Sequence, residues 1–303
     1  MSANYLVVDA FSDSVFGGVP VAVFTDAGDI SSGQCQHLAE EIMPSDTVFI
    51  DSAEASSGCY GFRFFNAQGS CGAGGHTIIA GLAALKHVHG AGAGAKLEQV
   101  KIDAGDSSFE AAIDTGEHKY PFLWRQSLSP EFDHFVPDIA DLARIIRVNP
   151  DDVNTTSYQC FIAACGLPYL IIALKSYEAL RAAELNTTAW AESSLPEALV
   201  DRILLHVPST GGLAADFHAR LLRRGDAAHA DPAIGEAMPA FAAYLCEHEQ
   251  VPQGTHSLTV MRGELNKRQS FIHLDVEKGE SGALSLRTAG DAVVSASGEI
   301  VNI

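Results

Sequence analysis

The stretch Ser70-Cys71-Gly72-Ala73-Gly74-Gly75-His76 leads directly into an almost uninterrupted apolar segment, Thr77 to Val88. A run with alternating apolar positions, Tyr60 to Phe65, precedes it and predicts a strand. The glycines permit a tight turn and a close approach of the backbone to its surroundings. A helix that is apolar on nearly all sides must be buried on most of them. This part of the chain therefore predicts a strand, a tight turn and a central, buried helix.

The glycine-rich turn has two chemical interpretations. Backbone N–H groups and the positive end of the following helix form the outline of an anion site. The alternative is a tight strand-to-helix turn without a ligand, because the stretch lacks the Gly-Lys-Ser/Thr of a Walker loop and the spacing of a dinucleotide fingerprint. His76 at the mouth of the helix is a candidate general acid/base, or a capping or core histidine.

The second half of the chain repeats this order without repeating the sequence. A predicted strand, Phe217 to Leu222, is followed by the loop Gly225 to Gly235 and a helix of about Ala237 to His248. Pro239 is tolerated only in the first turn, so this helix must begin near Glu236. We therefore expect an α+β fold of two pseudo-symmetric lobes, each a β-barrel-like sheet around a central helix.

The expected division places residues 1–120 in the N-terminal lobe and residues 121–303 in the C-terminal lobe. It leaves open whether the final strands return to the first lobe. The segment of about 116–150 is rich in Pro, Asp and aromatic residues and is interpreted as the crossover, without a long periodic element. The other elements are predicted as helices over Ser31–Ile42 and Ser176–Ala183 and as strands over Tyr5–Phe11, Val19–Phe24, Thr47–Ile50, Gln159–Ala164, Tyr169–Leu174, Ile203–Val207, His256–Met261, Ser270–Val276, Ala283–Arg287, Ala292–Ala296 and Ile300–Ile303.

The charge balance is strongly acidic, with 19 Lys and Arg against 38 Asp and Glu and a formal net charge of −19. Such a surface repels phosphate backbones and anionic lipid, which argues against nucleic-acid and membrane partners. No apolar run reaches the ~18 residues of a spanning helix, and the first residues indicate a strand, not a signal peptide. The six cysteines show no zinc spacing, so we expect reduced thiols, a cytoplasmic location and no metal or organic cofactor.

Two further polar positions stand beside predicted elements. Asp46 lies between Ser45 and Thr47, directly before an apolar strand. Asp231 begins Asp231-Pro232-Ala233-Ile234-Gly235, in the loop that opens the second helix. Each is an ordinary turn signal when taken alone.

Five short motifs, in the correct order along nearly the whole chain, resemble the PhzF family of phenazine-biosynthesis isomerases and their relatives. These share the diaminopimelate-epimerase fold. The motifs are Val8-Asp9-Ala10-Phe11 with Gly18-Val19-Pro20-Val21-Ala22-Val23-Phe24, Ser45-Asp46-Thr47-Val48-Phe49, Phe64-Phe65 with Gly75-His76-Thr77, Gly166-Leu167-Pro168-Tyr169-Leu170, and Asp231-Pro232-Ala233-Ile234-Gly235 with Ala243-Tyr244-Leu245.

The resemblance implies a cofactor-independent isomerase that moves a proton within a small hydroxy- or amino-acid-like substrate. It makes Asp46 the proton shuttle, with His76 and Asp231 lining a cleft between the lobes. Carboxylates that share an enclosed site repel each other's charge, so one of them can retain a proton near neutral pH. The family also implies a homodimer. The groups implied to bind the substrate are Gly74, Gly75, Gly235 and Glu236.

The sequence departs from the family pattern at two of these positions. Asp46 is one methylene shorter than the family's Glu, and catalytic alignment is sensitive to a displacement of about a bond length. Glu236 replaces a small Ser, so its charge opposes an anionic substrate unless it is protonated or acts as a second acid/base. Cys71 is a further candidate base, because residues 64–70 resemble the segment before the catalytic Cys of diaminopimelate epimerase.

These departures keep two alternative functions open. One is a two-base racemase or epimerase of an amino acid, in which a different pair of residues abstracts and returns the proton. The other is a family relative without catalytic activity that binds a metabolite or a protein partner.

Overall fold

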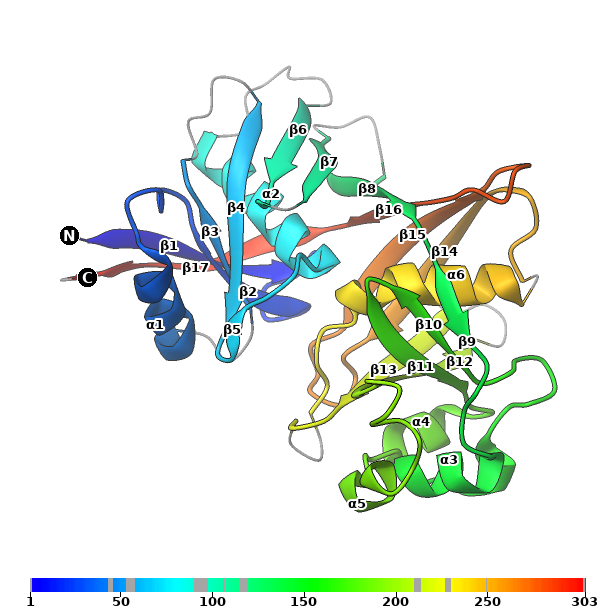
Figure 1. The fold of residues 1–303 in the computed structure, drawn as a ribbon. Coiled ribbons are helices and arrows are strands. Elements are labelled where there is room, and N and C mark those ends of the chain that lie inside the picture. Colours follow the sequence, from blue (N-terminus) through cyan, green and yellow to red (C-terminus); the bar gives the residue numbers. More distant parts are fainter. Residues whose placement is uncertain are drawn as a thin grey trace. The chain divides into compact units, whose positions relative to one another are not determined.

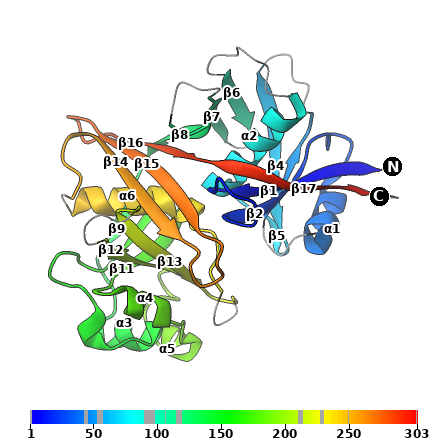
Figure 2. The same ribbon diagram turned by 180° about the vertical axis from the view of Figure 1, so that it is seen from behind.

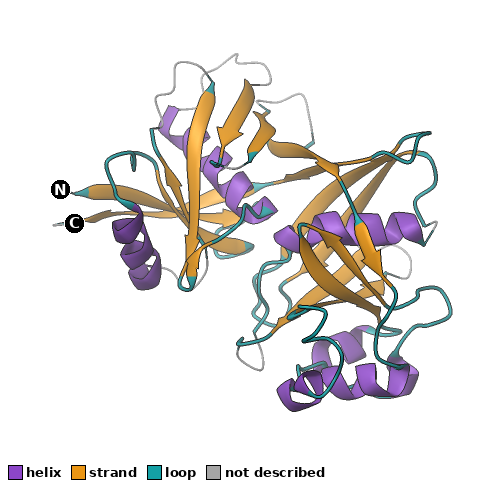
Figure 3. Cartoon of the chain, viewed as in Figure 1, coloured by secondary structure: helices purple, strands orange, loops and turns teal. Residues whose placement is uncertain are grey.

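The chain folds into two compact units, which are described separately. The computed structural model describes residues 2–42, 46–52, 58–89, 98–105, 107–114, 119–209, 214–226, 230–248, 250–301 and 303. Unit 1 comprises Met1–Gln126, Ser270–Ile272 and Arg287–Ile303, and unit 2 comprises Ser127–Gln269 and His273–Leu286. The C-terminal segment thus groups with unit 1. Strands dominate both units, and helices are few (Figure 3).

The sheet of unit 1 follows a definite order of pairing. Its described strands are β1 (Ala3–Ala10), β2 (Val19–Phe24), β3 (Thr47–Ile50), β4 (Cys59–Asn66), β5 (Gly69–Ser70), β6 (Glu98–Asp103), β7 (Ser108–Ile113) and β17 (Ala292–Ile300). β17 and β1 pair antiparallel, as do β1 and β2, whereas β2 and β3 pair parallel. β3 and β4 are antiparallel, and β4 and β6 are parallel. The pairing of β1 with β17 brings the two chain ends side by side (Figures 1 and 2).

The helix α2 (Gly75–His89) is the central helix of unit 1. Every residue from Gly75 to Leu85 is buried, and the helix contacts β1, β2, β3 and β17. The second helix of the unit, α1 (Ser32–Ile42), buries Cys35, Leu38 and Ala39 in a separate apolar cluster. The Ser31 hydroxyl accepts from the N–H of Gln34 at 3.4 Å, which is the hydrogen bond of an N-cap at the start of the helix.

Unit 2 repeats the same order of pairing, which explains the repeated order of elements in the sequence. Its strands are β9 (Glu131–Asp133), β10 (Phe161–Cys165), β11 (Leu167–Ala173), β12 (Arg202–Pro208), β13 (Phe217–Arg223) and β14 (Gly254–Arg262). β9–β10 and β10–β11 are antiparallel, β11–β12 parallel, β12–β13 antiparallel and β13–β14 parallel. Three further strands, β8 (Phe122–Leu128), β15 (Ser270–Lys278) and β16 (Leu284–Gly290), contribute residues to both units.

The central helix of unit 2 is α6 (Met238–Glu247). All residues from Met238 to Cys246 are buried, and the helix contacts β10 and β11. A short 3₁₀ turn, η2 (Gly235–Ala237), precedes it, and Pro239 lies in the first helical turn. The prediction that this helix begins beside Glu236, with Pro239 inside its first turn, is confirmed.

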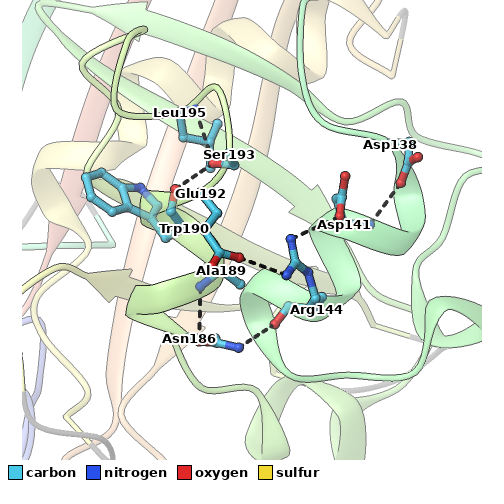
Figure 4. Close-up of polar contacts among 9 residues, drawn as sticks. All are labelled: Asp138, Asp141, Arg144, Asn186, Ala189, Trp190, Glu192, Ser193 and Leu195. Carbon is cyan, nitrogen blue, oxygen red and sulfur yellow. Dashed lines mark hydrogen bonds and ion pairs between the residues drawn. The ribbon is translucent and has the colours of Figure 1, made fainter.

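Three short helices of unit 2 pack against an apolar cluster that includes residues of β11, β12 and β13. They are α3 (Ile139–Ile146), α4 (Tyr177–Ala182) and α5 (Thr187–Ala191). Arg144 of α3 contacts Asp141 at 3.3 Å and Glu192, after α5, at 3.1 Å (Figure 4). The Asn186 side chain accepts from the N–H of Ala189 and donates to the carbonyl of Arg144 (Figure 4).

Several details of the sequence analysis were wrong or missing, including the strands β6 and β7, which were not predicted. The segment interpreted as the crossover contains β8, β9 and α3. The helix α5 was also missed. The stability of helices as short as α3 and α5 depends on tertiary packing more than on their own propensity. The final strand β17 is continuous, since β1 pairs with it along its length, and it ends at Ile300. The 3₁₀ helix η1 (Pro150–Asp152) was also not foreseen. Ser45 and Pro44 lie outside the described residues.

Candidate active site

The closest contact among the predicted catalytic residues joins Asp46 and His76 in unit 1. The His76 Nε2 atom lies 2.6 Å from the Asp46 Oδ2 atom. The His76 side chain is 5% exposed and the Asp46 side chain is 25% exposed. The histidine is therefore the enclosed member of the pair, and the carboxylate is the member that an incoming molecule can reach.

The local fold explains why two residues 30 positions apart come together. Asp46 directly precedes β3, whose first residue, Thr47, pairs with Phe65 of β4. The chain then turns through the β4–β5 hairpin, and the Cys71 N–H donates to the Phe64 carbonyl at 3.0 Å. This hydrogen bond holds the glycine-rich turn against β4, so α2 begins close to the start of β3. His76 is the second residue of α2.

The first turn of α2 is organised by Thr77. Its hydroxyl donates to the Gly74 carbonyl at 2.8 Å, and the Gly74 N–H lies 3.0 Å from the same hydroxyl oxygen. The Gly74 N–H is thus committed to Thr77, which weakens its predicted role as a donor to the substrate. The N–H groups of Gly75 and His76 belong to the first helical turn, where N–H groups have no acceptor within the helix.

Asp231 of unit 2 lies against an arginine that the sequence analysis did not select. Its Oδ1 atom is 3.6 Å from the Arg262 Nε atom, and both side chains are only 3% exposed. An Arg262 Nη2–H group also donates to the Asp231 backbone carbonyl. Burial lowers the pKa of Arg262, while the neighbouring Asp231 carboxylate opposes that effect. Asp231 is therefore held as half of a buried ion pair.

The other two predicted residues of unit 2 lie at the start of the α6 region. Gly235 is buried and opens η2, and the Ile234 carbonyl accepts from the Ala237 N–H at 2.9 Å. Glu236 accepts from the Tyr169 hydroxyl at 3.5 Å. Burial raises the pKa of Tyr169, and the negative charge of Glu236 adds to the rise. The Tyr169 hydroxyl therefore stays protonated and can serve Glu236 as a donor.

The structure thus brings Asp46 and His76 into contact in unit 1, and places Asp231, Gly235 and Glu236 in unit 2. Arg262 was missed, although a lone arginine ending an alternating strand, after Val260-Met261, was a usable signal. Among the described residues, no group of three or more His, Cys, Asp or Glu is arranged to hold a metal ion. None of the described helices is both long and apolar enough for a membrane span.

Known proteins resemble this chain over almost its full length. An uncharacterised isomerase of Mesorhizobium japonicum is 24% identical over 300 residues, which cover 98% of each chain. A trans-2,3-dihydro-3-hydroxyanthranilate isomerase of Pseudomonas aeruginosa is 22% identical and covers 97% of this chain and 98% of its own. The chain is an isomerase by these matches, which confirms the predicted enzyme class.

Solved structures confirm the predicted α+β fold. A PhzF-family phenazine biosynthesis protein of Bacillus anthracis superposes with a TM-score of 0.84 at 21% identity and covers all of both chains. A hydroxyproline epimerase of Agrobacterium vitis superposes with a TM-score of 0.61 at 11% identity, over 99% of this chain and 91% of its own. The sequence pattern of the phenazine biosynthesis-like proteins matches residues 8–298. The chain therefore belongs to the PhzC-PhzF family.

Proposed function

We propose that this isomerase moves a proton within a small hydroxy- or amino-acid-like molecule, without a cofactor, and that Asp46 carries the proton. The observation that supports this proposal is the 2.6 Å contact between His76 Nε2 and Asp46 Oδ2. Two acceptor lone pairs repel each other at this separation, so one proton must lie between the two atoms. The pair therefore holds one proton between the Nε2 atom of the buried His76 and the partly exposed Asp46 carboxylate.

The unequal exposure of the two side chains separates their roles. Asp46, at 25% exposure, is the group that meets the substrate and takes its proton. His76, at 5% exposure, orients the carboxylate and adjusts its charge by retaining or sharing the proton. The Nδ1 atom of His76 is buried and has no hydrogen-bond partner among the described residues. This arrangement supports a neutral imidazole that donates through Nε2 to an ionised Asp46.

The resemblance to the family adds Asp231, Gly75, Gly235 and Glu236 as residues of the same reaction. We propose substrate-binding roles for them, with Asp231 oriented by Arg262. The cytoplasmic location and the homodimer stay predictions. The substrate class rests on the names of the relatives, which include a dihydro-hydroxyanthranilate isomerase and a hydroxyproline epimerase.

The test is an exchange assay that does not require the natural substrate. The enzyme is incubated in deuterium oxide with a panel of small hydroxy and amino acids that includes trans-2,3-dihydro-3-hydroxyanthranilate. Loss of carbon-bound hydrogen signals is followed by proton NMR. Wild type is compared with Asp46→Asn and with the matched control Asp51→Asn, a surface carboxylate of unit 1 that pairs with Arg63 at 3.0 Å. We expect exchange or isomerisation in wild type and in the control, and its loss in Asp46→Asn.

Two results contradict the proposal in different ways. Full activity in Asp46→Asn shows that another group is the base, as in a two-base epimerase that uses Glu236, Asp231 or Cys71. Saturable binding of a panel member without any exchange or isomerisation indicates the relative that only binds its ligand.

A further inference from the structure

Unit 2 contains a polar site around Arg220, a residue that the proposed function does not use. Arg220 lies on β13 and is 3% exposed. Its Nη1 atom donates to the backbone carbonyls of Leu180, Arg181 and Ala183 at 3.2, 3.2 and 2.5 Å. These carbonyls lie at the end of α4, where the helix leaves its last acceptors unsatisfied. The Nη1 group of Arg220 therefore has a structural role at the end of α4.

The opposite edge of the guanidinium has no such partner. The Nε and Nη2 atoms of Arg220 are buried, and no described residue accepts a hydrogen bond from them. A buried donor without an acceptor is destabilising, because nothing compensates for the hydrogen bond to water that it has lost. The Nε–H and Nη2–H groups are parallel and match the two oxygens of a carboxylate. This edge therefore has the geometry of an oxyanion-binding fork.

A pocket in unit 2, partly open to solvent, is lined by Arg220. Its polar lining also includes Tyr177, His218, Asp231, Arg262 and Glu264. The His218 ring lies 5.2 Å from the Tyr177 ring, and its Nδ1 atom is buried without a partner among the described residues. A further unsatisfied polar atom, from a second residue, therefore belongs to the same pocket.

The charges around the pocket favour one negative ligand. The pocket lining holds three cations, Arg181, Arg220 and Arg262, and two carboxylates, Asp231 and Glu264. Burial lowers the pKa of Arg220, and the negative charges of Asp231 and Glu184 oppose that effect. Glu184 is already engaged by Arg147 at 3.3 Å, and Glu264 accepts from the Tyr177 hydroxyl. These three cations and two carboxylates leave one net positive charge, which suits a monoanion.

We propose that this pocket binds a small carboxylate monoanion through the Nε–H and Nη2–H groups of Arg220, with His218 beside it. The site lies entirely in unit 2 and does not include Asp46 or His76. It shares Asp231 and Arg262 with the proposed function, but its ligand-binding groups, Arg220 and His218, have no part in that function. A planar monoanion satisfies both open donors of the fork and neutralises the remaining charge.

The experiment follows the arginine Nε–H signals of ¹⁵N-labelled full-length protein during a titration with sodium acetate. Sodium chloride at equal ionic strength controls for screening, and acetamide is the neutral molecule of the same shape. Arg220→Lys keeps the charge but removes the fork. The matched control is Arg223→Lys on the same strand, where the arginine pairs with Asp226 at 2.9 Å near the surface.

We expect acetate to shift the Arg220 Nε–H signal saturably in wild type and in Arg223→Lys, and acetamide to leave it unchanged. Acetate affinity should fall at least about tenfold in Arg220→Lys, because a single ammonium cannot replace a bidentate contact. Because Arg220 also caps α4, the wild-type titration decides the matter even if the variant fails to fold. No saturable shift of the Arg220 signal, an equal response to acetamide, or unchanged affinity in Arg220→Lys overturns the proposal.

Discussion

His206, in the core of unit 2, should make the stability of the protein fall in mild acid. The side chain is fully buried on β12, with the rings of Tyr158, Phe241 and Tyr244 at 5.0, 5.1 and 5.5 Å. Neither ring nitrogen has a hydrogen-bond partner among the described residues. Burial, and to a smaller extent the nearby His248, lowers the pKa of His206 to about 3. The folded protein therefore keeps this imidazole neutral.

The sign and size of the effect follow from proton linkage. The unfolded chain protonates His206 below its ordinary pKa of about 6.5, whereas the folded protein does not protonate it until about pH 3. The unfolded state thus binds more protons between these values, and the free energy of unfolding decreases as the pH falls. At pH 5 the loss relative to pH 8 amounts to roughly 2 kcal/mol, with a limit of about 5 kcal/mol below pH 3.

The assay is urea denaturation of wild type and His206→Phe at pH 8 and pH 5. Phe keeps an aromatic ring of similar size and cannot protonate. We expect the variant to lose about 2 kcal/mol less than wild type between the two pH values. His87→Phe, at an exposed position near the end of α2, is the matched control and should behave like wild type. Equal losses in wild type and His206→Phe would refute the reasoning.

Four further predictions concern the candidate site. Asp46→Asn should lower turnover by ~100- to 10,000-fold and leave the melting temperature unchanged, as measured by the exchange assay and calorimetry. Asp231→Asn should cost ~3–5 kcal/mol in urea denaturation, because it leaves the buried Arg262 without its counter-charge; the double variant with Arg262→Met should recover most of this loss. Cys71→Ser should keep nearly full activity, whereas rapid inactivation by alkylation at Cys71, with protection by substrate, would favour a thiol mechanism. In deuterium oxide, single-turnover product should retain part of the migrating hydrogen if Asp46 acts alone; complete deuteration would indicate two bases.

The candidate site shows which of its features can be predicted from the sequence and which cannot. The motif around His76 and the motif around Asp46 each identified a residue, but the first also fits a strand-to-helix turn without a ligand, and the second is an ordinary turn signal by itself. Their contact depends on the pairing of β3 with β4 and on the Cys71 N–H that holds the glycine-rich turn against β4. Register between strands is set by the packing of the whole sheet, so no local pattern could supply the 2.6 Å distance.

The sequence by itself determined the repeated order of a strand, a glycine-containing loop and a helix, the two central helices and the family. These features are encoded in local patterns: apolar runs long enough to bury α2 and α6, glycines before them and Pro239 at a helix start. The tertiary structure alone decided the partners of the polar side chains. Asp231 with Arg262, and Arg220 with the end of α4, are joined across long stretches of chain. Buried polar groups need hydrogen-bond or ion-pair partners. Tertiary packing, and not proximity in the sequence, determines which groups become partners.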